Sequence, residues 1–341
     1  MLTRASIPPA ALAALDLLAP YDSLLLAVSG GPDSVALMLL AAQWPGRAAR
    51  RIAVATVDHG LRAGSRAEAG MVRDWAGALG FEHHCLVWGG DKPVSRIQER
   101  ARTARYALLV ECAVAIGARA IVTAHHADDQ AETILFRLSR GSGVAGLSGM
   151  TVLAPCGPVC LARPLLEASK TELEEICREF GHPFLTDPSN AQEKFARARL
   201  RRLAPLLAAQ GLDRAALTRL GRRARRATAA LDHFAQATGR TACIDSDEAG
   251  ARFRAADLRQ APEEIVLRLL AMEIARLAPA AQLRLERLER LGQSLIHALA
   301  DDRKWRTTLA GVLIETRNCE LIMRRAPPRR AQNPTVEPTR E

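Results

Sequence analysis

Residues 29–34 read SGGPDS and lie between an apolar run at 24–28, LLLAV, and an apolar helical pattern at 33–44. A glycine-rich turn between a buried strand and a helix is typical of a phosphate-binding loop. Glycine lets the backbone approach an anion, and the helix presents free N–H groups to it. The loop contains no Lys, which separates it from the GxxxxGK[ST] loop of nucleotide hydrolases. We expect it to hold nucleotide phosphates through Ser29, Gly30, Gly31, Pro32, Asp33 and Ser34.

Asp33 is an acidic residue in a loop expected to bind phosphates. A carboxylate there would repel the ligand unless a divalent cation lies between them, so Asp33 is predicted to hold Mg²⁺. The alternative is structural, because Asp or Ser directly after a turn also caps the N-terminus of a helix.

Short apolar runs alternate with helical patterns around this loop. The runs are at 24–28, 52–57, 82–88 and 120–123, and the helical patterns at 33–44, 65–79, 94–116 and 128–139. Parallel strands need crossover connections, which helices supply, so strict alternation predicts an α/β fold: a parallel, Rossmann-like sheet with helices on both faces. Such sheets bind ligands at the carboxyl ends of their strands, where residues 29–34 lie.

The pattern changes beyond residue 140. Residues 141–160 are rich in Gly and Pro and are predicted to be irregular. Their string 141–146 matches GxGxxG but follows a helix, which is the wrong context for a dinucleotide turn. Helices are predicted at 169–180, 195–209, 213–237 and 280–299, and a terminal hairpin at 305–314 and 320–324. We therefore expect a catalytic domain at 1–210, a basic, mainly helical domain at 211–325 and a disordered tail at 326–341.

The net charge of +10 is confined to the second half of the chain. Residues 1–190 carry 18 Lys and Arg against 19 Asp and Glu, which leaves 29 basic and 18 acidic residues for 191–341. This asymmetry favours a polyanionic partner held beside a separate reaction site; the alternative is a well-solvated, Arg-rich surface. The run RLGRRARRA at 219–227 is expected to bind the phosphates of such a partner through Arg222 and Arg223. Since only 4% of residues are aromatic, base stacking should contribute little there.

The seven cysteines are scattered and odd in number, which indicates reduced thiols rather than a disulfide framework. Cys156 and Cys160 have the wrong spacing for a zinc or iron–sulfur site. The apolar run at 10–18 contains Asp16 and lacks the pattern of a signal peptide, so we expect a cytoplasmic protein without a membrane span.

A group of polar side chains follows the predicted strand at 120–123. It comprises His125, His126, Asp128, Asp129 and Glu132. The first four of these fall within five positions, 125–129, directly after a strand, which indicates a functional site. Asp128 and Glu132 are four positions apart and would share a helix face. One interpretation is a metal-dependent phosphoesterase that uses Asp58, His59, His125 and Asp128, although such a site would not need residues 29–34.

Further motifs accompany the loop: VDHGLR at 57–62, QERARTARY at 98–106, TAHHADDQAET at 123–133, RGSGVAGLSGM at 140–150, RPLL at 163–166 and DPSN at 187–190. With SGGPDS, they make the chain resemble the PP-loop (N-type) ATP pyrophosphatases, and within them the tRNA(Ile)-lysidine synthases. One departure is Ala198, where the family commonly has Asn in an RNxxR pattern; the arginines remain as Arg197 and Arg201.

The resemblance implies a ligase that uses ATP, Mg²⁺ and free lysine to convert the wobble cytidine in the CAU anticodon of isoleucine tRNA to lysidine. The reaction would pass through an adenylated cytidine and release AMP and pyrophosphate. Asp128 or Asp129 would recognise the lysine amine or act as base, and the sequence does not rank them. The implied catalytic residues are Asp33, Asp129, Asp128, His125 and Arg105, with His126 near ATP. The implied contacts to substrate or tRNA are Arg102, Arg105, Glu132, Arg197 and Arg201.

Other interpretations stay open at this point. Arg102 could pair with Glu99 on an exposed helix instead of meeting RNA. A tRNA thiolase of the same superfamily would usually need a CxxC pair, and a non-catalytic RNA-binding protein would have no need of Asp33. The sequence leaves the oligomeric state open, a homodimer being one arrangement.

Overall fold

The computed structural model describes residues 8–60, 64–90, 97–185 and 196–327, with the backbone alone at 97–98, 196–199 and 201. Contacts divide the chain into two compact units, one of residues 1–141 and 146–222, the other of 142–145 and 223–341. The predicted tail beyond 327, the DPSN motif and the side chains of Arg197 and Arg201 lie outside the described residues. Within these residues no helix is long and apolar enough to cross a membrane. All seven cysteines are free thiols.

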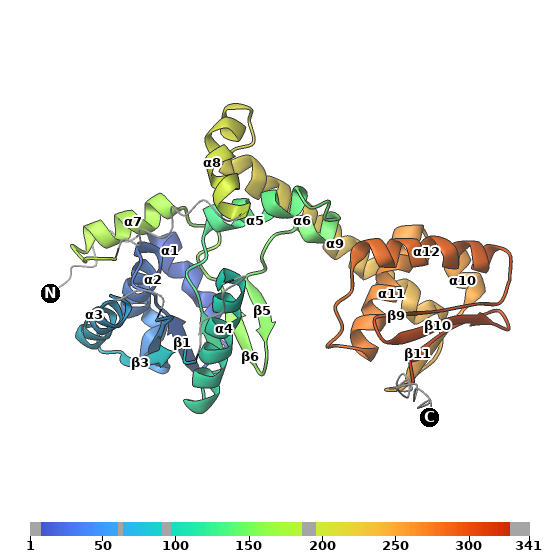
Figure 1. The fold of residues 1–341 in the computed structure, drawn as a ribbon, viewed down its shortest axis with the longest axis horizontal. Coiled ribbons are helices and arrows are strands. Elements are labelled where there is room, and N and C mark those ends of the chain that lie inside the picture. Colours follow the sequence, from blue (N-terminus) through green and yellow to red (C-terminus); the bar gives the residue numbers. More distant parts are fainter. Residues whose placement is uncertain (1–7, 61–63, 91–96, 186–195, 328–341) are drawn as a thin grey trace, which may run out of the picture. The chain divides into compact units, whose positions relative to one another are not determined.

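The first unit is built on a six-stranded sheet with the order β3-β2-β1-β4-β6-β5 (Figure 1). Its strands are β1 (Ser23–Ala27), β2 (Arg51–Asp58), β3 (Glu82–Val87), β4 (Ala120–Val122), β5 (Leu153–Cys156) and β6 (Val159–Ala162). Strands β3, β2, β1, β4 and β6 run parallel. The α/β fold predicted from the alternating pattern is confirmed.

Strands β5 and β6 correct the prediction that residues 141–160 are irregular. They pair antiparallel at the edge of the sheet, joined by a turn in which Gly157 has a φ of 61°. Each strand has four residues, too few to show an alternating pattern, and Pro155 in β5 is tolerated because β5 is an edge strand. The short helix α6 (Val144–Leu147) precedes them.

Helices cover both faces of the sheet. The helices that pack on it are α2 (Pro32–Gln43), α3 (Ser65–Ala78), α4 (Ile97–Ala115) and α7 (Lys170–Glu179). Helices α5 (Ala127–Leu138) and α8 (Ala196–Ala209) contact each other, and α1 (Pro9–Ala13), η1 (Ala14–Leu18) and η2 (Pro45–Ala49) are short turns. Successive strand residues point to opposite faces. Leu24 and Leu26 therefore pack with α2, α3 and α7, whereas Leu25 packs with α4.

The second unit combines helices with a five-stranded antiparallel sheet of order β7-β8-β11-β10-β9. Its strands are β7 (Cys243–Ser246), β8 (Gly250–Arg254), β9 (Trp305–Leu309), β10 (Val312–Arg317) and β11 (Glu320–Arg325). Its helices are α10 (Ala255–Arg259), α11 (Glu263–Leu277), α12 (Leu285–Ala300) and most of α9 (Arg214–Ala242), which begins in the first unit. Apolar side chains of α11 and α12 pack on this sheet.

A helical C-terminal region is confirmed, but its sheet is larger than the predicted hairpin. The segment 305–314 forms two strands, because Ala310 and Gly311 adopt positive φ values of 51° and 81° and reverse the chain. Strands β7 and β8 were not predicted, since their exposed and charged residues give no continuous apolar run.

Candidate active site

The SGGPDS loop connects β1 to α2 at the carboxyl edge of the sheet. Gly30 has a φ of 87°, and a Cβ atom there would lie 2.5 Å from Leu185 Cδ1. The Leu185 N–H also donates to the Gly30 carbonyl at 2.8 Å. Ser34 Oγ donates to the Gly31 carbonyl at 2.9 Å and accepts the Ser29 N–H at 3.1 Å. These contacts hold the loop in shape through its own residues and Leu185, which suits a rigid anion site.

Asp33 is the second residue of α2 and does not cap the helix, whose N-cap is Gly31 with no side-chain hydrogen bond. Its Oδ1 atom is buried without a hydrogen-bond partner. A buried carboxylate oxygen is costly to leave unpaired, and a cation would satisfy it. Mg²⁺ is typically held by one or two carboxylates together with substrate phosphates, so Asp33 beside the loop fits that ion.

His126 joins the loop to the acidic start of α5. It is buried, and its Nε2 atom lies 3.5 Å from both Asp33 Oδ2 and Asp129 Oδ2, while Nδ1 lies 3.6 Å from Asp128 Oδ2. Burial alone lowers the pKa of His126, but the contacts with Asp128 and Asp33 and the charge of Asp129 outweigh it and raise the pKa to about 10. The charged ring lies at ion-pair distance from the carboxylates on both sides. The Asp128 N–H also donates to Nδ1 at 3.3 Å, a hydrogen bond that exists only while Nδ1 is unprotonated.

His125 has the opposite protonation state. Its Nδ1 atom lies 2.8 Å from Thr123 Oγ1. Burial, followed by the charges of Arg163, Arg102 and Arg105, lowers the pKa of His125 to about 3, so the ring is neutral near pH 7. Two adjacent histidines therefore offer one neutral and one charged imidazole at the same edge of the sheet.

The two aspartates of α5 have different partners. Asp128 Oδ2 accepts the Lys170 N–H of α7 at 3.0 Å, and Asp128 Oδ1 lies 3.8 Å from Arg214 Nε of α9. Contact with His126 lowers the pKa of Asp128 to about 2. Asp129 Oδ2 accepts the His126 N–H at 3.2 Å, and burial raises the pKa of Asp129. Asp128 is thus committed to contacts with other helices, whereas Asp129 has the higher proton affinity.

The charge of Glu132 contributes, after burial, to the raised pKa of Asp129. The Glu132 side chain is half-buried one turn further along α5. Among the described residues, no three His, Cys, Asp or Glu side chains are arranged to hold a metal ion. The four residues of the phosphoesterase interpretation accordingly form no such group.

Arg102 and Arg105 lie on the first turns of α4 with Tyr106. The guanidinium Cζ atoms lie 5.1 Å and 5.8 Å from the centre of the Tyr106 ring. Arg102 is exposed and Arg105 is half-buried. Neither side chain forms an ion pair among the described residues, so the alternative in which Arg102 pairs with Glu99 is wrong. Arg163, directly after β6, belongs to the same surroundings, as its effect on His125 indicates. The sequence shows Arg163 as the first residue of the RPLL motif but gives it no role, because β6 was not predicted.

The remaining predicted residues lie elsewhere. Arg222 and Arg223 are exposed on α9, on either side of the division between the two units. Arg197 and Arg201 belong to α8, and the structure describes only the backbone of these two residues.

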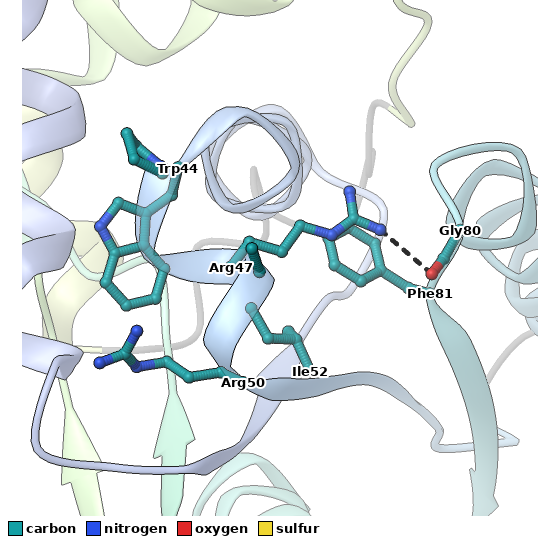
Figure 2. A pocket seen from close by; sticks show the side chains of 8 residues that line it. Trp44, Arg47, Arg50, Ile52, Gly80 and Phe81 are labelled. Atoms are coloured by element: carbon teal, nitrogen blue, oxygen red, sulfur yellow. Dashed lines mark hydrogen bonds between the residues drawn. The ribbon is translucent and has the colours of Figure 1, made fainter.

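A cavity of about 410 Å³ lies at the opposite, amino-terminal edge of the sheet, between η2 and the start of β3 (Figure 2). The Arg47 guanidinium lies 4.2 Å from the centre of the Phe81 ring and donates to the carbonyls of Leu79 and Gly80. Arg50 lies 4.9 Å from the Trp44 ring. Both cations donate to backbone carbonyls in helix ends and turns, so this cavity has a structural explanation.

Comparison with known proteins extends over both units. A family model described as a PP-loop domain matches residues 11–207. The chain is 48% identical over 310 residues to the tRNA(Ile)-lysidine synthase of Methylobacterium sp. (strain 4-46), with 89% of each chain covered. It is 44% identical over 348 residues to the tRNA(Ile)-lysidine synthase of Bradyrhizobium sp. (strain BTAi1), with 95% of this chain and 96% of that relative covered.

Among solved structures, the U34-tRNA thiolase NcsA from Methanococcus maripaludis shares the fold alone, with a TM-score of 0.53 and 14% identity over 62% of this chain and 77% of that chain. The lysidine synthases, in contrast, match at high identity from one unit to the other. The chain belongs to the PP-loop family and, within it, to the tRNA(Ile)-lysidine synthases.

Proposed function

We propose that the protein ligates free lysine to C2 of the wobble cytidine in the CAU anticodon of isoleucine tRNA, with ATP converted to AMP and pyrophosphate. The observation that carries this proposal is the direct contact of His126 with both Asp33 of the phosphate loop and Asp129 of α5. If Asp33 serves ATP and Asp129 serves the lysine amine, this contact supports a two-step ligation, which needs the two substrates next to each other. The name of the relatives supplies the identity of the activated base.

The first step makes a leaving group. Cytosine O2 departs poorly, so its attack on the α-phosphorus of ATP converts it to an adenylate. The residues at 29–34 would hold the departing pyrophosphate by positioning and charge. Mg²⁺ at Asp33 would neutralise the charge that develops on the phosphates. The charged His126 ring beside Asp33 adds a second positive group at that place.

The second step delivers lysine. Its side-chain ammonium has a pKa of about 10.4 and must lose a proton before it attacks C2. We assign the base to Asp129, since burial raises the pKa of this carboxyl and thus its proton affinity. Glu132 would bind the ammonium from the same helix. Asp128, which contacts α7 and α9, would hold α5 in place rather than touch lysine.

The tRNA would be held by basic residues of both units. Arg102 and Arg105 would contact the anticodon, and Arg222 and Arg223 would bind tRNA phosphates. Arg197 and Arg201 would also contact the tRNA. Ala198 between them offers no side-chain hydrogen bond, unlike the Asn that the family commonly has there. We propose a catalytic domain at 1–210 and a tRNA-binding domain at 211–325. The cytoplasm, where ATP, lysine and tRNA occur together, is the proposed location, and a homodimer is one arrangement to test.

Release of pyrophosphate by the purified protein tests the proposal when ATP, lysine and isoleucine tRNA are omitted in turn and the product nucleoside is identified by mass spectrometry. We expect release to require tRNA, lysidine to require lysine as well, and Asp33→Asn to abolish both. Hydrolysis of simple phosphodiesters without tRNA would favour the phosphoesterase instead, and no release under any condition would refute the ligase.

A further inference from the structure

Arg163 is a buried cation without a counter-ion among the described residues. Its side chain is 8% exposed, one guanidinium nitrogen, Nη1, donates to the Thr151 carbonyl at 2.8 Å, and its Nε atom is buried with no hydrogen-bond partner. Buried arginines are normally paired, because an unpaired buried charge is costly. The missing partner is therefore expected to come from a ligand.

The topology places Arg163 at the edge of the sheet that carries the active site. Strand β6 pairs with β4 in parallel, with Ala162 opposite Val122, so Arg163 lies level with Thr123 and close to His125. Helix α4 runs back toward the start of β4, and its first turns therefore lie at the carboxyl edge of the sheet. Arg102, Arg105 and Tyr106 belong to these turns.

The charges of this place are uniformly positive. Arg102, Arg105 and Arg163 all act to lower the pKa of His125, and Arg102 also acts to lower that of Arg163. No carboxylate lies within ion-pair distance of the three guanidinium groups in the part of the chain that the structure describes. Exposure decreases from Arg102 through Arg105 to Arg163, so positive charge continues from the protein surface inward.

We propose that Arg163, with Arg102 and Arg105, forms a pocket for the RNA phosphodiester next to the target nucleotide. This inference rests on the proposed function and adds a binding residue to it. A phosphate accepts hydrogen bonds from several guanidinium groups at once. The Tyr106 ring and the arginine planes offer stacking surfaces for an unstacked base, the form in which RNA is read in loops.

Two phosphate sources compete for such a pocket, the RNA chain and ATP. The order β1-β4-β6 separates Arg163 from the SGGPDS loop by two strand spacings, about 10 Å, and that loop already serves the phosphates of ATP. The three arginines also extend from the surface into the interior, which suits a single nucleotide of a long RNA chain that turns inward from the surface. Both arguments favour the RNA phosphodiester.

The experiment measures binding of isoleucine tRNA to the full chain, without ATP or lysine, so it does not depend on lysidine formation. The tRNA carries one uncharged methylphosphonate linkage, either 5′ or 3′ of the target cytidine. We expect the wild-type protein to lose about 10- to 100-fold in affinity with one of the two linkages. Arg163→Met should lose the same factor with unmodified tRNA and nothing further with that methylphosphonate, and Arg163→Lys should recover part of it.

Matched measurements separate the alternatives. Arg119→Met removes an exposed arginine at the amino-terminal edge of the same sheet and should leave tRNA affinity unchanged. An effect of Arg163→Met on ATP affinity alone, or additive losses with the methylphosphonate, would overturn the pocket. If Arg163→Met does not fold, wild-type tolerance of both methylphosphonates would overturn it equally. Loss of binding from one methylphosphonate in a protein that makes no lysidine would refute the proposed function but retain the pocket.

Discussion

His125 and His126 are identical side chains whose neighbours leave the first neutral and the second positively charged. Three carboxylates surround His126, whereas His125 has arginines around it and a threonine hydroxyl as its hydrogen-bond partner. The charged ring compensates the acidic residues of the loop and α5, and the neutral ring adds no further charge to the arginine-rich side. Acidic groups around one ring and arginines around the other thus give two successive histidines different protonation states.

The neutral state of His125 has a measurable pH dependence. In the unfolded chain its pKa is about 6.5, and in the folded protein it is about 3. A depressed histidine pKa stabilises the fold above the unfolded value, and this contribution declines as the pH falls below 6.5. We expect the ring to stay neutral at pH 5 in ¹⁵N NMR spectra. His125→Gln should lose less stability than wild type between pH 7 and pH 5; a ring that titrates near pH 6.5 would contradict this.

At the scale of the loop, Gly30 and Gly31 form a matched pair of test positions. Gly30→Ala forces a side chain into a φ of 87° and places its Cβ atom 2.5 Å from Leu185 Cδ1. We expect a loss of about 1 to 3 kcal/mol in unfolding free energy, with weaker ATP binding. In Gly31→Ala the new Cβ atom would contact only Ser29 Oγ, at 3.8 Å. The unfolding free energy measured with urea should therefore change little. Equal effects of the two substitutions would argue against this account.

Asp128 connects the start of α5 to the starts of α7 and α9. Asp128→Ala should lower the unfolding free energy by about 1 kcal/mol, because the Lys170 N–H loses its acceptor. Asp128→Asn keeps an acceptor oxygen and should retain more stability and activity. Glu175→Ala, on an exposed position of α7, is the control in the same denaturation series. A larger loss of lysidine formation in Asp128→Asn than in Asp129→Asn would show that the assignment of the base is wrong.

The sequence was most informative where local patterns decide the structure. The apolar run, the glycines and the helix around residues 29–34 predict the strand, turn and helix, and the alternation predicts the parallel sheet. Local patterns could not predict which side chains from distant segments come into contact, because such contacts depend on the whole fold. Asp128 and Asp129 differ because Lys170 and Arg214 reach only the former, and Arg163 gained meaning only once β6 placed it beside β4.

For the whole molecule, the confinement of the net positive charge to the second half of the chain leads to a salt-dependence test. Arg222→Glu with Arg223→Glu should weaken tRNA binding, and the slope of log affinity against log salt should fall by about one for each lost phosphate contact. ATP binding should not change. Arg73→Glu, exposed on α3 of the first unit, is the control. Unchanged tRNA affinity and slope in the double variant would refute the role of these arginines.

The contact of Gly30 with Leu185 also has a genetic consequence. Truncating Leu185 would remove the steric overlap with an alanine at position 30 but would leave the backbone in a left-handed conformation. Since a second change repairs only one of two defects, a screen for intragenic suppressors of Gly30→Ala should return reversion to glycine far more often than substitution of Leu185. Position 30 should therefore keep a strong preference for glycine even when its neighbours change.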